Sequence, residues 1–127
     1  MKKRIRSTWV SRKERSIWCC DFSSFGSDRA GFLAELAASE TVINSQRDNS
    51  LPVAVDLYDV HMEPELVEFF RNYARPNSNP VWKMAIVHIS GARRLWLHMA
   101  AGVTWPPQAK FFEDYEAAKD WLVGEKF

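Results

Sequence analysis

Leu51-Pro-Val-Ala-Val-Asp-Leu-Tyr58 is apolar at nearly every position. An apolar run of this length is typical of a strand that lies inside a sheet and is covered on both faces. Pro52 has no backbone N–H to donate, so we expect it at the start of that strand. Trp82-Lys-Met-Ala-Ile-Val-His-Ile89 is a second run of the same kind. Two such runs predict a sheet of parallel strands between layers of helices.

Segments with helical spacing of apolar residues alternate with these strands. In the first, Phe32, Leu36 and Ile43 mark the buried side, and Ser27 and Asp28 suit its amino end. The second segment starts at Pro64, where a missing N–H costs nothing, and its buried stripe consists of Leu66, Phe69, Phe70 and Tyr73. We expect four helices, at about residues 27–46, 64–74, 91–101 and 113–123.

Three shorter strands complete the predicted sheet. Thr8–Lys13 and Ser16–Phe22 are rich in β-favouring residues and flank a polar turn at Arg12–Arg15. A short strand follows at 110–112. The resulting order is ββαβαβαβα, and helical crossovers join parallel neighbours. The sequence therefore predicts an α/β sandwich with a mostly parallel five-stranded sheet, four covering helices and an antiparallel first strand at the edge.

The charge of the chain is concentrated at its amino end. The 127 residues carry a net charge of +1, but residues 1–15 hold seven basic side chains against Glu14 alone. We divide the chain into a basic arm at 1–7 and one domain at 8–127, because 127 residues are too few for two ordinary cores. The arm could meet phosphates or an anionic membrane, or it could be a solvated terminus. Nucleic-acid binding is not expected.

No targeting signal or metal framework is visible. No long apolar stretch follows Met1-Lys-Lys-Arg4, so we expect no signal peptide, no membrane span and a cytoplasmic protein. Cys19 and Cys20 are neighbours in a predicted strand, so their side chains should point to opposite faces and stay reduced. Two adjacent cysteines do not make a zinc site, and no cofactor is expected. Three tryptophans are expected in the core: Trp18, Trp82 and Trp121.

Titratable side chains follow the predicted strands at their carboxyl ends, where ligands of parallel sheets collect. They are Asp21, Asp59, His61, His88 and Ser90. Histidines and carboxylates there could act as acid, base or ligand, and Asp59-x-His61-x-Glu63 could present oxygen and nitrogen to a metal. The alternatives are an ordinary loop histidine at 61, a core histidine at 88 and capping aspartates. Common nucleophile and phosphate-loop motifs are missing, so we do not expect an enzyme.

The third helix is apolar on nearly every side, at Leu95-Trp-Leu-His-Met-Ala-Ala101. A helix that lies on a sheet normally keeps one solvated face. Either the Trp105-Pro-Pro107 loop covers this helix, or it forms an exposed patch for a protein partner, a second copy or an acyl chain. The patch would consist of Arg93, Arg94, Leu95, Trp96, Met99 and Trp105.

Four segments in order resemble the STAS/SpoIIAA-like family. They are Trp18-Cys-Cys-Asp-Phe-Ser23, Val53-Ala-Val-Asp-Leu-Tyr-Asp-Val60, Trp82-Lys-Met-Ala-Ile-Val87 and Phe111-Phe-Glu-Asp-Tyr-Glu-Ala-Ala-Lys-Asp-Trp-Leu122. The closing segment is the most specific of the four. The resemblance covers residues 16–123 and implies a small α/β sandwich that binds or regulates, with no cofactor common to the family.

Compared with the family that it resembles, this chain lacks a phosphorylation site. In the anti-sigma-factor antagonists of the wider family, a serine between the third strand and the second helix is phosphorylated and binding is abolished. Here no Ser or Thr stands between Tyr58 and Pro64. We therefore expect a non-catalytic binding or regulatory module without that switch. The alternatives are a lipid-like or small-molecule pocket between the third helix and the sheet, and a small hydrolase that uses Asp59, His61 and His88.

Overall fold

The computed structural model describes residues 5–61, 63–74, 80–89, 91–95 and 108–124. Within them, the chain forms one five-stranded sheet in the order β1-β2-β3-β4-β5. β1 is antiparallel to β2, and the other three pairings are parallel, so the sheet is mixed. The strands are β1 (Thr8–Arg12), β2 (Arg15–Asp21), β3 (Leu51–Asp56), β4 (Val81–Val87) and β5 (Ala109–Phe112).

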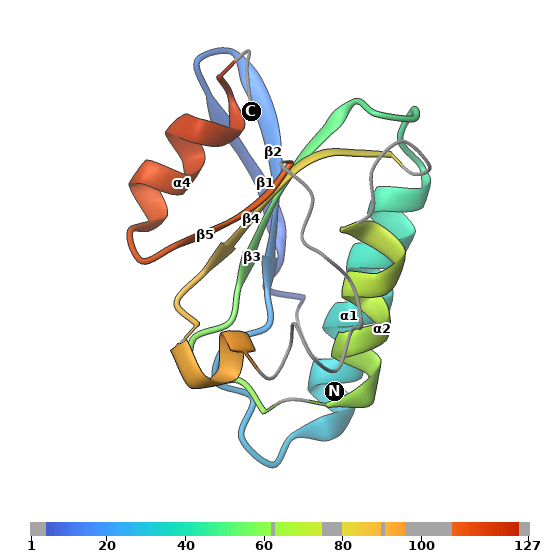
Figure 1. Ribbon diagram of the computed structural model, residues 1–127. Coiled ribbons are helices and arrows are strands. Elements are labelled where there is room, and N and C mark those ends of the chain that lie inside the picture. Colours follow the sequence, from blue (N-terminus) through green and yellow to red (C-terminus); the bar gives the residue numbers. More distant parts are fainter. Residues whose placement is uncertain (1–4, 62, 75–79, 90, 96–107, 125–127) are drawn as a thin grey trace.

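Helices cover both faces of the sheet, as the α/β prediction requires. α1 (Arg29–Asn44) and α2 (Pro64–Tyr73) lie on one face, and α4 (Tyr115–Leu122) lies on the other (Figure 1). Residues 91–95 are also helical, at the position of the predicted third helix. The rest of that predicted helix lies outside the described residues.

Local sequence signals account for the ends of these elements. The side chain of Asp28 accepts a hydrogen bond from Gly31 N and caps α1, as expected. Pro64 occupies the first turn of α2. Between β1 and β2, Lys13 (φ 50°) and Glu14 (φ 66°) both have left-handed backbone, the pattern of a two-residue type I′ hairpin turn.

The core is divided by the sheet into two clusters. Cys20 packs in the cluster under α1 and α2, whereas Cys19 packs under α4, which confirms the predicted opposite faces. Both cysteines are free. β3 is buried from Leu51 to Val55. The apolar run that predicted a central strand is therefore the middle strand of the sheet. The predicted stripe of α2 is buried as well: Leu66, Phe69, Phe70 and Tyr73.

Two of the three tryptophans predicted for the core are only half-buried. Trp18 is buried, but Trp82 and Trp121 are partly exposed. Leu51 pairs with Val81 and Pro52 with Lys83, so the register skips Trp82 at an irregularity in β4. Lys83 is the buried residue instead, and its ammonium nitrogen lies 4.6 Å from the centre of the Trp82 ring and 4.9 Å from that of Trp121.

Candidate functional site

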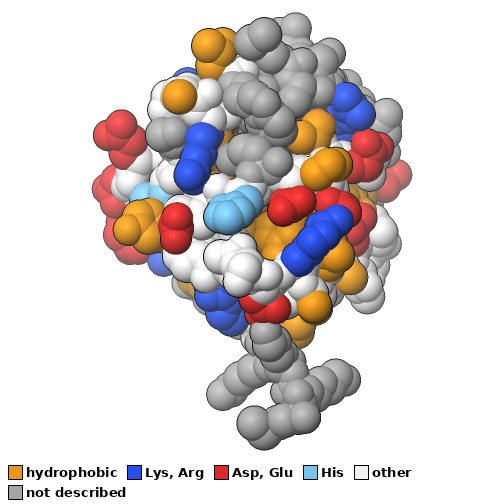
Figure 2. All heavy atoms as spheres, turned by 90° about the horizontal axis from the view of Figure 1, so that it is seen from below, with side chains coloured by type: hydrophobic (Ala, Val, Ile, Leu, Met, Phe, Trp, Pro, Cys, Tyr) orange, Lys and Arg blue, Asp and Glu red, His pale blue; other side chains and the backbone are white. Residues whose placement is uncertain are grey.

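The carboxyl ends of β2, β3 and β4 meet at one edge of the sheet. Asp21 and Asp56 are the last residues of β2 and β3 and are register partners, and His88 directly follows β4. Figure 2 views the molecule from this end and shows histidine, acidic and basic side chains beside apolar ones. Ligands of parallel sheets collect at this edge, so it is the first place to look for a site.

His88 and Asp56 form the pair at the centre of this edge. Nδ1 of His88 lies 3.1 Å from Oδ1 of Asp56, and the same oxygen accepts a hydrogen bond from the backbone N–H of Tyr58 at 3.0 Å. The imidazole centroid lies 6.2 Å from that of the Tyr58 ring and 6.1 Å from that of Tyr115. Burial raises the pKa of the Tyr115 phenol above its usual range, so Tyr115 faces His88 as a neutral ring.

His88 is exposed because it lies one residue beyond β4, so the alternative of a core histidine is wrong. We did not predict from the sequence that Asp56 is the hydrogen-bond partner of His88. A signal was present, since Asp56 is the only charged residue in the apolar run Leu51–Tyr58. The sequence did not show which strand-end residue His88 would meet.

Each of the three parallel strand ends is followed by a non-glycine residue with left-handed backbone. These residues are Ser24 (φ 52°) after β2, Asp59 (φ 52°) after β3 and His88 (φ 64°) after β4. Backbone hydrogen bonds continue beyond the strands, from Ser24 N to Tyr58 O at 3.0 Å and from His88 N to Phe112 O at 3.2 Å. A left-handed non-glycine residue costs about 1–2 kcal/mol and persists where its surroundings hold it.

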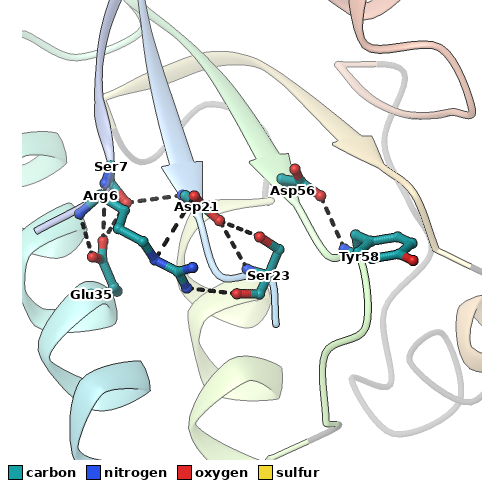
Figure 3. A network of polar contacts seen from close by, with 7 residues as sticks. All are labelled: Arg6, Ser7, Asp21, Ser23, Glu35, Asp56 and Tyr58. Carbon is teal, nitrogen blue, oxygen red and sulfur yellow. Dashed lines mark hydrogen bonds and ion pairs between the residues drawn. The ribbon is translucent and has the colours of Figure 1, made fainter. Parts of the chain in front are cut away.

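Asp21 belongs to a second polar group at this edge (Figure 3). Its Oδ1 accepts hydrogen bonds from the backbone N–H (3.1 Å) and the hydroxyl (2.5 Å) of Ser23. Nη2 of Arg6 donates to Ser23 O at 2.6 Å, and the guanidinium lies 3.9 Å from the centre of the Phe25 ring. The Ser23 hydroxyl donates its proton to Asp21, so this group builds a turn.

A buried carboxylate anchors the amino-terminal segment to this group. Glu35 is 2% exposed, and its carboxylate accepts hydrogen bonds from Arg6 N (2.5 Å), Ser7 N (3.1 Å) and Ser7 Oγ (2.7 Å). The Ser7 hydroxyl in turn accepts from Asp21 N at 2.9 Å (Figure 3). We did not predict a role for Glu35 from the sequence. A charged residue next to Leu36, on the buried side of the predicted helix, could have indicated a buried carboxylate. Within the predicted arm, Arg6 and Ser7 thus contact the domain.

Asp59 and His61 do not join His88 in one cluster. Both are exposed, and in the described part of the chain His88 is bonded to Asp56 and to neither of them. Glu63 pairs instead with Arg29 at 3.5 Å. Among the described residues, no group of three His, Cys, Asp or Glu side chains could hold a metal ion. Asp59, His61 and Glu63 therefore do not form a three-ligand group in the described part of the chain.

The predicted apolar patch is described only in part. Leu95 is 61% exposed, and the Arg94 guanidinium lies 4.2 Å from the centre of the Phe111 ring. Arg93 is half-buried. The other residues predicted for the patch lie outside the described residues: Trp96, Met99 and Trp105. Ser90, predicted at the end of the second apolar strand, also lies outside them.

Comparisons of the chain with family models, with curated proteins and with solved structures gave no match. In the part of the chain that the structure describes, no helix has the length and apolar character needed to cross a membrane.

Proposed function

We propose that this chain is a non-catalytic binding or regulatory module of the STAS-like type. It binds a protein partner through the strand-end surface, which we define as Tyr58, His88, Arg94 and Leu95. The observation that carries the proposal is the exposure of two large apolar side chains in the segments that follow β3 and β4: Tyr58 is 62% exposed and Leu95 is 61% exposed. Tyrosine and arginine are enriched in protein interfaces.

The polar groups of the edge favour binding over catalysis. A general base needs a nucleophile or a substrate proton within reach. Asp56 orients the imidazole of His88 at 3.1 Å, but in the described part of the chain no hydroxyl or thiol is hydrogen-bonded to that imidazole. Among the described residues near this edge, the Ser23 hydroxyl donates to Asp21, and both cysteines are buried in the core. A histidine held by a carboxylate and flanked by two tyrosine rings is well suited to present a fixed surface to a partner.

The sequence at the start of α2 supports a module without the phosphorylation switch. Glu63 is the N-cap of α2 and Pro64 is the first residue of the helix, and Arg29 contacts Glu63 at 3.5 Å and also pairs with Glu65. A carboxylate near the amino end of a helix is stabilised by the helix dipole without any modification. Two reduced, buried cysteines fit the proposed cytoplasmic location.

A crosslinking experiment tests the proposed surface. A photoreactive amino acid at position 58 is compared with one at position 41, since Thr41 is exposed on α1, away from the strand-end surface. A protein captured at 58 and not at 41 is purified, and its affinity is measured by calorimetry. We expect Tyr58→Ala and Leu95→Ala each to weaken its binding by at least about tenfold, whereas Thr41→Ala leaves it unchanged. Equal affinity for all four proteins would overturn the proposal.

Acid–base catalysis is the second candidate, and the His88–Asp56 pair is the observation that favours it. In this function Asp56, rather than Asp59 or His61, would orient the imidazole. Hydrolysis of p-nitrophenyl acetate by the wild type and by His88→Gln distinguishes the candidates. Turnover that falls at least about a hundredfold in the variant would favour catalysis, and equal rates favour the binding module.

A further inference from the structure

A cavity of about 950 Å³ opens at the amino ends of the strands, opposite the strand-end surface. It is lined by the first residues of β2 and β3, by Trp9 and Trp82, and by the 45–50 segment that follows α1. Its volume is at the upper end of the range found for small-molecule sites. The sequence did not point to this end of the sheet, because ligand sites were expected only at the carboxyl ends.

The two tryptophans of the cavity are held in place by contacts within the protein. Trp9 packs edge-on against Trp18, with ring centres 5.3 Å apart, and still leaves 44% of its surface exposed. Trp82 is turned out of the regular ladder where the register between β3 and β4 shifts at Pro52. The Arg15 guanidinium lies 5.2 Å from the centre of the Trp82 ring. Aromatic faces that are fixed before binding cost little ordering entropy when a ligand stacks on them.

The charged side chains described in the cavity lining are both basic. Arg15 and Arg47 are both exposed and line it, and among the described residues that line it there is no Asp or Glu. Glu14 and Asp48 are their neighbours in the chain but do not line the cavity. Paired arginines favour phosphate or carboxylate, because the guanidinium presents several N–H groups in one plane.

Hydrogen bonds organise the 45–50 segment. The Ser45 hydroxyl donates to Val42 O at 2.7 Å, and the Ser50 hydroxyl donates to Arg47 O at 2.7 Å. The Ser45 oxygen also accepts a hydrogen bond from Gln46 Nε2 at 3.0 Å. The Ser50 hydroxyl donates its proton to the backbone, and its oxygen lone pairs can accept from a ligand. The cavity combines aromatic faces, two cations and hydrogen-bond acceptors.

We propose that this cavity binds a free mononucleotide, whose base stacks on Trp9 and whose phosphate pairs with Arg15 and Arg47. A nucleoside monophosphate carries the three features that the lining matches: a planar ring, an anion and N–H donors. Base stacking on an aromatic side chain tolerates different bases, so the cavity selects the class and not one base. This site is at the opposite end of the sheet from the strand-end surface, and it is independent of the proposed partner.

Titration of the full chain with adenosine monophosphate tests the proposal, followed by tryptophan fluorescence and by calorimetry. Two ligand controls separate the contributions: adenosine has the ring without the anion, and ribose 5-phosphate has the anion without the ring. We expect each control to bind at least about tenfold more weakly than adenosine monophosphate. Uridine monophosphate should bind within about tenfold of adenosine monophosphate, because stacking is tolerant of the base.

Three variants locate the site. Arg47→Ala and Trp9→Leu should each weaken the binding of adenosine monophosphate by about tenfold or more. Arg71→Ala is the matched control, since Arg71 is an exposed arginine on α2 that does not line the cavity, and it should bind like the wild type. Urea denaturation of each variant checks that it is folded.

Three results would overturn the proposal. The first is that adenosine monophosphate shows no saturable binding up to about 10 mM, a concentration above the Kd of a specific site. The second is equal loss of affinity in Arg47→Ala and Arg71→Ala, which would reflect non-specific charge. The third is binding of a hexanucleotide more than about tenfold tighter than that of the monophosphate. This result would mean that the cavity binds a nucleic-acid strand and not a free mononucleotide.

Discussion

The ammonium group of Lys83 in β4 donates hydrogen bonds to the backbone carbonyl of Trp121 at 2.7 Å, in the last turn of α4, and to that of Gly124 at 2.9 Å. The last carbonyls of a helix have no partner within the helix. Gly124 N donates to the Trp121 carbonyl at 3.2 Å, and the buried lysine from the sheet adds a charged donor. The rings of Trp82 and Trp121 cover the charge of Lys83. The contact fixes the end of α4 on the sheet.

Lys83→Met should lower the free energy of unfolding by about 1–3 kcal/mol, because two carbonyls lose a charged donor while the side-chain volume is kept. Lys13→Met is the control, since Lys13 is an exposed lysine in the turn between β1 and β2. Urea denaturation at pH 7 measures both variants. Equal stability of the two variants would contradict a capping role for Lys83.

The same lysine predicts a pH dependence. Burial, with the charges of Arg15 and Lys110, lowers the pKa of Lys83 from its ordinary value of 10.5. Between the lowered pKa and 10.5 the unfolded chain binds more protons than the folded one, so the contribution of Lys83 to the free energy of unfolding rises with pH in this window. The difference between wild type and Lys83→Met should therefore grow as pH increases there and be constant below it. A difference that shrinks with increasing pH would contradict the lowered pKa.

Glu35→Ala should lower the free energy of unfolding by about 1.5–3 kcal/mol, because Ser7 loses a charged acceptor in a buried position. The variant should also be cleaved faster by trypsin after Arg6, whose backbone N–H is bonded to Glu35 in the wild type. Glu68→Ala, at an exposed position of α2, provides the comparison. Wild-type stability and cleavage in Glu35→Ala would show that the amino-terminal segment is held by other contacts.

Both thiols should be inert in the folded protein. Burial raises the pKa of the Cys20 thiol to about 12, and burial likewise raises that of Cys19. Reaction with a disulfide reagent needs the thiolate, so we expect negligible labelling at pH 8 and full labelling of both thiols in guanidinium. Absorbance of the released thiolate follows the reaction. Rapid labelling of one thiol in the folded state would identify a reactive cysteine.

His88→Gly and His88→Ala should differ in stability although both remove the bond to Asp56. At φ 64° the backbone of His88 is in the left-handed region, where a Cβ costs about 1–2 kcal/mol and glycine is unstrained. The glycine variant should therefore be the more stable of the two by about 1 kcal/mol in urea denaturation. Equal stabilities would mean that the loop relaxes once the histidine is removed.

The elements of this fold could be predicted because their signals are local. The apolar run of β3, the stripe of α2 and the caps at Asp28 and Pro64 each depend on residues a few positions apart, and the structure confirms them. The alternation that separates Cys19 from Cys20 is also a property of one strand. The half-buried Trp82 was missed because a register irregularity depends on how two strands pair, which one strand does not reveal.

The contacts of the candidate sites were decided by the tertiary structure. Ser7 meets Glu35 across 28 positions, His88 meets Asp56 across 32, and Lys83 meets Trp121 across 38. Each pair depends on which strands are neighbours and in which register, and many arrangements satisfy the same local patterns. The sequence by itself determined where strands and helices form and which faces are apolar. Only the packing of the sheet decided which charged side chains meet, because those distances are set by strand order and not by neighbours in the chain.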